Sequence, residues 1–185
     1  MTASAQQAQS IFISSRCLYN TQQVEAALDA MAQAISRDLH DRNPLILCVL
    51  TGAIIPMGHL LTRLDFPLEI DYIHATRYRG ETAGGELHWL ARPQTPMKDR
   101  VVLIVDDILD EGHTLAGLLE YCRDQQASEV YSAVLVEKHH DRRVAGLKSE
   151  YVGLDVDDNY VFGYGMDYKG YLRNAPGIYA VTEKN

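Results

Sequence analysis

The chain has few cysteines and no long apolar stretch, and each absence excludes a class of protein. Its three cysteines, Cys17, Cys48 and Cys122, are odd in number and form no CxxC pair. This argues against a disulfide framework and indicates a reducing compartment. The longest apolar run, LILCVL at 45–50, is too short to span a bilayer. The first ten residues lack the basic and apolar segments of a signal peptide, so we expect a cytoplasmic protein without membrane association.

Positive charge is also scarce. Seventeen Lys and Arg residues face 25 Asp and Glu residues, which gives a formal net charge of −8, and no basic stripe runs along the sequence. Surfaces that bind nucleic acid carry such a stripe, so we expect no nucleic-acid partner. A small anionic ligand is still compatible with this charge, because local backbone donors can outweigh it.

The rest of the composition is typical of a globular domain, with 46% hydrophobic and 23% charged residues in a chain of 185. Along the chain, segments with apolar residues at helical spacing alternate with short continuous runs of apolar residues. Helices are expected at 21–39, where Asn20 and Gln23 form a cap pair, from Pro56 onward, and at 114–125. Strands are expected at 45–50, 68–75, 101–105 and 130–136. This alternation predicts an α/β fold with a mostly parallel, twisted sheet flanked by helices.

Three segments fall outside this alternation. Residues 1–10 are expected to form a frayed tail. Residues 77–100 contain three glycines and two prolines with little periodicity. Loops of that length inside a domain are typically lids or binding loops, so we interpret 77–97 as a mobile lid, formed by a long loop or a loose hairpin. From Tyr151 onward, short strand-like pieces are expected.

The segment VVLIVDDILDEGHT at 101–114 combines five apolar residues, four carboxylates within six positions and a glycine. Gly112 permits a positive φ, so the amides of 110–114 can converge at the start of the next helix. Unpaired donors and the helix dipole favour a phosphate there. Asp106 and Asp107, expected at the end of the strand, are suited to accept hydrogen bonds from a sugar diol.

These groups together suit a ribose 5-phosphate whose C1 becomes oxocarbenium-like. Asp110, one turn further on, could act as a base or hold the cationic centre. The segment is neither a Walker A loop nor a dinucleotide-binding fingerprint, because GxxxxGK[ST] and GxGxxG are both absent. The loops at 51–53 and 137–143 are expected to meet 106–114 at the carboxyl ends of the strands, where such sheets bind ligands.

Four motifs in order resemble type I phosphoribosyltransferases. VVLIVDDILDEGHT resembles the family's phosphoribosyl pyrophosphate (PRPP) signature. LTGA at 50–53 resembles its pyrophosphate loop, and LVEK at 135–138 its purine-contacting strand end. YVGLDVDDNYVFGYGMDYKGYLR at 151–173 is similar to the C-terminal region of hypoxanthine-guanine phosphoribosyltransferases. The resemblance covers most of residues 45–181.

This resemblance implies a single phosphoribosyltransferase domain over residues 1–185. Its core would cover about 21–148, and the chain ends, at about 10–20 and 151–185, would build a small hood over it. By analogy with the family, the protein would be a homodimer or homotetramer.

The resemblance also implies ligand contacts for a set of residues. PRPP and its ribose phosphate would be bound by Asp106, Asp107, Asp110, Glu111, Gly112, His113 and Thr114. Pyrophosphate would be bound by Thr51, Gly52, Tyr78 and Arg173. The purine would be bound by Lys138, Tyr160, Val161 and Asp167.

Within that set, Asp110 would be the general base near N7 of the purine, while N9 attacks C1 of the ribose. Lys138 would donate to a purine 6-oxo group, which favours hypoxanthine or guanine over adenine, and Tyr160 would stack on the base. Asp167 would contact Mg²⁺, the implied cofactor, which would neutralise the leaving pyrophosphate together with Arg173.

Three positions depart from the family pattern. Glu111 stands where Thr or Ser is usual, so we expect its side chain to point away from the phosphate and only its amide to contribute. Arg77 replaces the Ser that commonly precedes the lid tyrosine. Thr51 occupies a variable position where some relatives have Lys.

Taken singly, several of these residues have simpler interpretations. Lys138 by itself is consistent with a solvated residue at the end of a strand, and Tyr160 with a core residue of an alternating strand. Asp167 and Arg173 by themselves are consistent with ordinary surface charges. His139-His140-Asp141 could suggest a metal site, but adjacent residues of a strand point to opposite faces, which argues against one.

The leading hypothesis is therefore an enzyme that makes IMP or GMP from PRPP and hypoxanthine or guanine. One alternative is a regulator of the same fold that senses PRPP or nucleotide and binds nucleic acid. Another is a Mg²⁺-dependent phosphohydrolase that uses the aspartate cluster.

Overall fold

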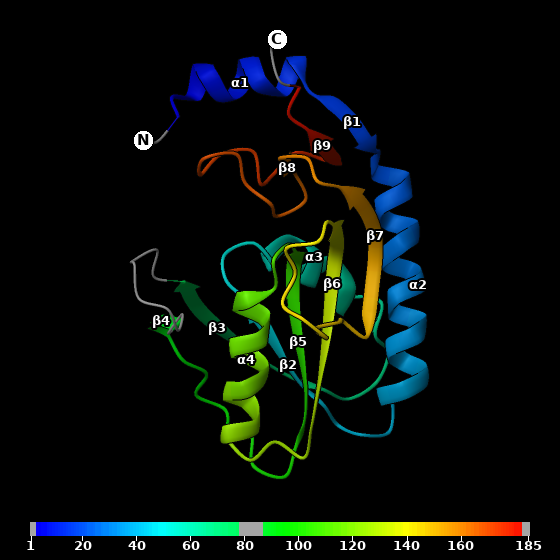
Figure 1. Cartoon of the computed structure of the whole chain (residues 1–185). Coiled ribbons are helices and arrows are strands. Elements are labelled where there is room, and N and C mark those ends of the chain that lie inside the picture. The colour runs from blue at the N-terminus through cyan, green and yellow to red at the C-terminus, as the bar shows by residue number, and fades with distance from the viewer. Residues whose placement is uncertain (1–2, 78–86, 183–185) are drawn as a thin grey trace.

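The centre of the protein is a six-stranded sheet, seen in a computed structural model that describes residues 3–77 and 87–182. Its strands are β2 (Leu45–Val49), β3 (Glu69–Arg77), β4 (Leu87–Ala91), β5 (Val101–Leu109), β6 (Glu129–His139) and β7 (Tyr151–Asp157). They lie in the order β4-β3-β2-β5-β6-β7 (Figure 1). Within this sheet, β3 and β4 pair antiparallel and the other neighbours pair in parallel. The predicted mostly parallel sheet is confirmed.

Helices cover both faces of this sheet. The described residues form α1 (Ala5–Ser14), α2 (Thr21–Leu39), α3 (Ile54–Leu61) and α4 (His113–Asp124). Helix α2 packs against β7 and α3, whereas α4 packs against β3, β5 and β6. Figure 1 shows α4 in front of the sheet and α3 behind it. None of the helices in the described ranges combines the length and apolarity that crossing a membrane requires.

The pattern of buried residues explains these elements. All five residues of β2 and the first five of β5 are buried, as expected of central strands covered on both faces. Helix α2 begins at the predicted cap, where Asn20 and Gln23 form a reciprocal capping box. The buried stripe of α2 consists of Val24, Leu28, Met31, Ala32, Ile35 and Leu39. Helical spacing and strand burial therefore agree with the sequence pattern.

A small antiparallel sheet built from the two chain ends lies above the core (Figure 1). It contains β1 (Arg16–Tyr19), β9 (Ile178–Ala180) and β8 (Val161–Phe162) in that order. We call this sheet, with α1 and the chain after Asp157, the hood. The expected hood boundary at Tyr151 was too early, because β7 pairs in parallel with β6 and belongs to the central sheet.

The expected frayed tail was also wrong. Residues 5–14 form α1, which begins at a capping box between Ser4 and Gln7. Phe12 of this helix packs edge-on against Tyr179 and Phe162 of the hood. Tertiary contacts of a few apolar side chains therefore hold a helix that shows little periodicity by itself.

Three other boundaries differ from expectation. Helix α3 begins at Ile54, two residues before Pro56. Strand β5 continues to Leu109 because it pairs with β6 along its whole length, so Asp106 and Asp107 lie within the strand and not at its end. Part of the expected lid is strand β4, which pairs with β3, while residues 78–86 of that lid, including Tyr78, lie outside the described residues.

Candidate active site

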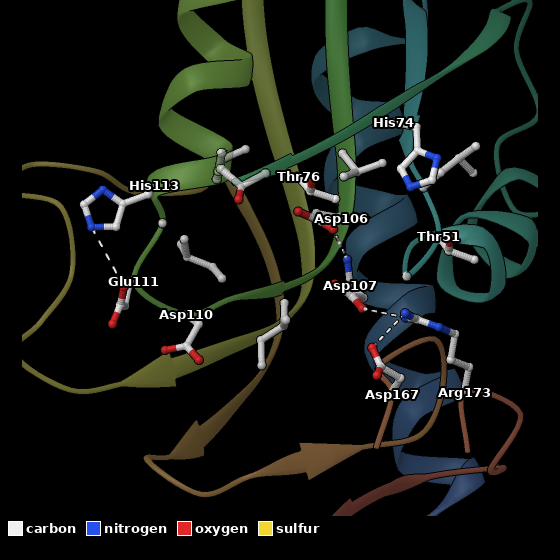
Figure 2. A pocket seen from close by; sticks show the side chains of 18 residues that line it. Thr51, His74, Thr76, Asp106, Asp107, Asp110, Glu111, His113, Asp167 and Arg173 are labelled. Atoms are coloured by element: carbon white, nitrogen blue, oxygen red, sulfur yellow. Dashed lines mark hydrogen bonds and ion pairs between the residues drawn. The ribbon is translucent and has the colours of Figure 1, made fainter. Parts of the chain in front are cut away.

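The carboxyl ends of β2 and β5 open into a cavity of about 680 Å³ (Figure 2). Its walls include the turn after β2, two β3 side chains (His74 and Thr76) and the loop at 106–114. Two hood residues, Asp167 and Arg173, close one side. This is the end of the sheet where parallel α/β folds bind ligands. The cavity therefore joins three of the sequence motifs.

One wall of the cavity is the start of helix α4. Gly112 caps this helix with a φ of +85°, and no side chain of the described residues caps the first amides. The backbone angle favours glycine here, and a Cβ at Gly112 would overlap the end of the Leu147 side chain, which would have to move. The amides that follow have no helical carbonyl partner and carry the positive end of the helix dipole. They can hold a dianionic phosphate.

A pair of adjacent carboxylates lies beside these amides. The Asp107 amide donates to Asp106 Oδ1 at 2.8 Å. Burial raises the pKa of Asp106, and the neighbouring Asp107 charge raises it further. Burial also raises the pKa of Asp107, although Asp106 and the Arg173 guanidinium act in the opposite direction. Hydroxyl donors from a sugar diol would satisfy this pair and relieve its repulsion.

Asp110 is held by a donor on each carboxylate oxygen. Lys138 Nζ lies 2.6 Å from Oδ2, and His140 Nε2 lies 2.6 Å from Oδ1. Burial acts to raise the pKa of Asp110, but the Lys138 and His140 hydrogen bonds together outweigh it, so the pKa is lowered. Asp110 is consequently a carboxylate at neutral pH, as a general base must be.

The hood contributes a cation at the opposite wall. Arg173 Nη2 lies 2.7 Å from Asp167 Oδ1, and its Nη1 donates to the Gly165 carbonyl at 2.6 Å. The other oxygen of Asp167 accepts from the Gly170 amide at 2.6 Å. Gly165, with a φ of +111°, has no room for a Cβ because the Gly52 carbonyl lies against it. The guanidinium is thereby fixed beside the turn after β2.

A second cavity, of about 220 Å³, shares a wall with the first. It is lined by Asp107, Ile108, Asp110, Lys138, Tyr160, Val161, Met166 and Asp167. Lys138 is buried, Tyr160 is 50% exposed, and Val161 is buried in β8. All four residues expected at a purine therefore lie around one cavity that adjoins Asp110.

The remaining predicted residues occupy the rim. Thr51 is exposed and Thr114 half-buried, and both line the larger cavity. His113 is exposed, and its Nε2 lies 3.9 Å from Glu111 Oε2. Glu111 is exposed, with Oε1 3.9 Å from Arg142 Nε. Figure 2 shows its carboxylate beside His113 and apart from Asp106, and Glu111 also lines the larger cavity.

Sequence reasoning missed three residues near these cavities. His74 and Thr76 alternate along β3 and face the larger cavity, which period-two alternation toward the end of β3 could have indicated. His140 contacts Asp110, whereas His139 contacts Asp155 at 2.8 Å. The two histidines diverge as strand alternation predicts, but nothing in the sequence identified the partner of His140.

The fold and this arrangement of groups define a phosphoribosyltransferase, and comparison with known proteins agrees. The family model described as phosphoribosyl transferase domain matches residues 14–169, and the chain belongs to this family. Within it, the chain is similar to hypoxanthine-guanine-xanthine phosphoribosyltransferase of Tritrichomonas foetus, with 33% identity over 91% of the chain and 92% of that protein. It is 31% identical to hypoxanthine-guanine phosphoribosyltransferase of Streptococcus thermophilus, over 91% of the chain and 94% of that protein.

Solved structures agree with these sequence relatives. The chain resembles a hypoxanthine phosphoribosyltransferase from Staphylococcus aureus with a TM-score of 0.87, at 26% identity over 94% of this chain and 95% of the other. A structure of a hypoxanthine-guanine-xanthine phosphoribosyltransferase superposes with a TM-score of 0.83, at 31% identity over 91% of this chain and 97% of the other. The type I phosphoribosyltransferase fold is thus confirmed.

Proposed function

We propose that this protein catalyses purine salvage: it transfers the 5-phosphoribosyl group of PRPP to N9 of hypoxanthine or guanine, giving IMP or GMP and pyrophosphate. One observation carries this proposal. The cavity beside the α4 amides and the cavity lined by Lys138 and Tyr160 meet at Asp107 and Asp110. A phosphoribosyl group in the first and a base in the second would bring C1 and N9 together beside a carboxylate.

Each group then has a defined task. The α4 amides and Thr114 hold the 5-phosphate, and Asp106 and Asp107 accept hydrogen bonds from the ribose hydroxyls. Their negative charge, near C1, stabilises the oxocarbenium-like transition state. As N9 attacks C1 and the C1–O bond to pyrophosphate breaks, Asp110 accepts the proton released from the base, which is typically worth about 10²–10⁴-fold in rate.

Recognition of the base follows from the smaller cavity. Lys138, a donor without acceptor capacity, suits a 6-oxo group and not the 6-amino group of adenine. Tyr160 would offer an aromatic face to the base, and the backbone of Val161 would contact its position 2; both residues line the smaller cavity. Tyr160 is 50% exposed although its ring already packs against Tyr168, so a bound base would cover apolar surface that is open to solvent.

The pyrophosphate end suits Mg²⁺. This ion usually binds through one or two protein carboxylates and completes its shell with water and substrate phosphates. Asp167 lines both cavities and lies beside Arg173 and the Thr51-Gly52 turn, which fits this requirement. When bound, Mg²⁺ would supply Lewis-acid neutralisation of pyrophosphate, and Arg173 would hold the same group through its guanidinium.

The test is a panel of nucleobases. Purified protein is incubated with Mg²⁺ and PRPP and with hypoxanthine, guanine, xanthine or adenine in turn, and nucleotides are separated by chromatography. We expect IMP and GMP and no AMP. Absence of product with both hypoxanthine and guanine would contradict the proposal. Phosphate release from a sugar phosphate without any purine would instead favour the phosphohydrolase.

Neither other function has equal support. The relatives reported above are enzymes by name, and nothing among them favours a nucleic-acid-binding regulator. The net charge of −8 also disfavours that partner. We further propose a cytoplasmic homodimer or homotetramer with PRPP and a 6-oxopurine as its ligands and neither nucleic acid nor membrane as a partner. Light scattering of the purified protein tests the assembly state.

A further inference from the structure

His140 is the first residue beyond strand β6, and its side chain turns inward. Only 2% of that side chain is exposed, compared with 59% for its neighbour His139. A buried imidazole requires hydrogen-bond partners for its nitrogens, because an unpaired polar group away from water is costly. Both ring nitrogens of His140 are engaged in hydrogen bonds, which explains the burial.

These two hydrogen bonds fix the tautomer. The Arg142 amide donates to His140 Nδ1 at 3.1 Å, so Nδ1 carries a lone pair and the ring proton is on Nε2. Nε2 then donates to Asp110 Oδ1 at 2.6 Å. The turn that supplies the amide is itself anchored, because Arg142 binds both oxygens of Asp158 at 2.8 and 2.9 Å. The ring is therefore held from both sides.

Lys138 and His140 differ in what else they can reach. Lys138 lines the cavity that suits the base, and so does Asp110, whereas His140 is not among its lining residues. Lys138 can exchange Asp110 Oδ2 for a purine 6-oxo group. His140, with its other nitrogen on the Arg142 amide, stays on Oδ1.

We propose that His140 is the positioning residue for Asp110: it holds Oδ1 in place while Lys138 leaves Oδ2 for the base, so that Oδ2 faces the purine. This inference rests on the proposed function. Other charged groups around the pair are Lys138, Glu111, Arg142 and Asp158. Among the described residues, Lys138 and His140 are the side chains that donate hydrogen bonds to Asp110.

Removing the His140 donor has a predictable effect. The hydrogen bond from His140 is one of the interactions that lower the pKa of Asp110. Without it, Asp110 becomes protonated at a higher pH, and the acid limb of the profile of kcat/KM against pH moves to higher pH. Because a hydrogen bond to a charged group is lost, we expect kcat to fall about tenfold or more. PRPP affinity should change by less than about twofold, since His140 does not line the cavity beside the α4 amides.

Three variants test the proposal. His140→Leu removes the donor at similar volume, and His140→Gln keeps an amide donor near the Nε2 position. His139→Leu, on the exposed neighbour, is the matched control. We expect the acid-limb shift and kcat loss only in His140→Leu, with substantial rescue in His140→Gln. An unchanged acid limb in a folded His140→Leu protein, or equal losses in His140→Leu and His139→Leu, would overturn the proposal.

A measurement on the unmodified protein covers the case in which His140→Leu does not fold. Nitrogen-15 NMR of the histidine side chains, assigned with His140→Gln, should show the Nε2–H tautomer for His140 near neutral pH. A proton on Nδ1 would overturn the proposal. This readout needs no turnover, so it separates failure of the His140 assignment from failure of the proposed purine transfer, which the wild-type nucleobase panel reports.

Discussion

The carboxylate of Asp107 occupies the space that a Cβ on Gly52 would fill. All three carboxyl-group atoms of Asp107 lie closer to that position than real Cβ atoms approach their neighbours. The turn after β2 and strand β5 therefore fit together only because residue 52 has no side chain. This contact fixes the expected pyrophosphate turn against the carboxylates expected at the ribose.

Gly52→Ala should displace Asp107 and impair catalysis far more than folding. A misplacement of about 1 Å in a site can cost about 10²-fold in rate, and we expect kcat/KM for PRPP to fall by at least that factor. The matched control is Gly58→Ala in helix α3, where nothing among the described residues lies within 4 Å of the added Cβ apart from the chain neighbours and backbone of the same helix. That variant should keep its activity and gain up to about 1 kcal/mol of stability from helix propensity. Steady-state kinetics with thermal melts checks both, and equal kinetics in the two variants would contradict the role of Gly52.

Gly112→Ala should weaken phosphate binding, and by more than the strain of a positive φ alone would explain. Gly112 has a φ of +85° and the Leu147 side chain where a Cβ would lie, whereas Gly146 has a φ of +76° and open space around the position of its Cβ among the described residues. Gly146→Ala therefore isolates the left-handed backbone penalty, roughly 1–2 kcal/mol. Calorimetric titration with PRPP should show tenfold or greater weakening for Gly112→Ala and normal affinity for Gly146→Ala. Normal PRPP affinity in both variants would show that the α4 amides do not hold the phosphate.

Asp106→Asn should stabilise the protein at neutral pH. The pKa of Asp106 is raised in the folded state by burial and by the Asp107 charge, so folding favours its protonated form. The stability that the protonated form contributes to the folded protein is fully present below the ordinary pKa of aspartate, about 3.9. It is lost as the pH rises through the raised pKa of the folded state. Asparagine cannot ionise, so the variant avoids this loss of stability. The loss is about 1.4 kcal/mol for each unit by which the folded protein raises the pKa of Asp106. The melting temperature of the variant should exceed that of wild type at pH 7 and converge with it near pH 4.

The control for that comparison is Asp155→Asn, which alters an exposed carboxylate paired with His139. Such surface pairs contribute about 0–1 kcal/mol, so its melting curve should follow wild type across the pH range. Thermal melts from pH 4 to 8 provide the measurement. A melting temperature for Asp106→Asn below wild type at pH 7 would show that the Asp106–Asp107 pair is not strained in the folded protein.

Asp110→Asn should lower kcat by about 10²–10⁴-fold, the usual value of general-base assistance, while PRPP binding changes much less. Asp155→Asn serves again as the control and should retain its activity, because that carboxylate is exposed and lines neither cavity of the site. Single-turnover rates and direct PRPP titrations separate the two effects. Equal losses of kcat and PRPP affinity in Asp110→Asn would indicate a structural role.

Local patterns in the sequence were sufficient for much of the fold. Apolar runs predicted β2 and β5, and the spacing of Val24, Leu28 and Ile35 predicted α2, because burial of one face or both leaves a period in the sequence. The predicted ends of the strands were less accurate. β5 runs on to Leu109 because β6 offers it a partner, and hydrogen-bond pairing between distant strands has no local signature.

The candidate site divides in the same way. The glycine at 112 and the carboxylates at 106 and 107 lie in one segment, so their chemistry could be inferred from spacing alone. The resemblance to the family supplied Lys138 and Arg173, which are far away in the chain. The expected frayed tail failed because α1 depends on Phe12 packing against the hood.

By itself, the sequence determined the alternation of helices and strands, the glycine turn that we propose binds phosphate, and the order of four motifs that resemble those of the family. Only the tertiary structure decided that His140 holds Asp110, that Gly52 makes room for Asp107 and that the two cavities share a wall. The physical reason is that each of these contacts joins segments far apart in the chain. Their geometry depends on how the strands stack and how the turns leave them, which composition and periodicity do not encode.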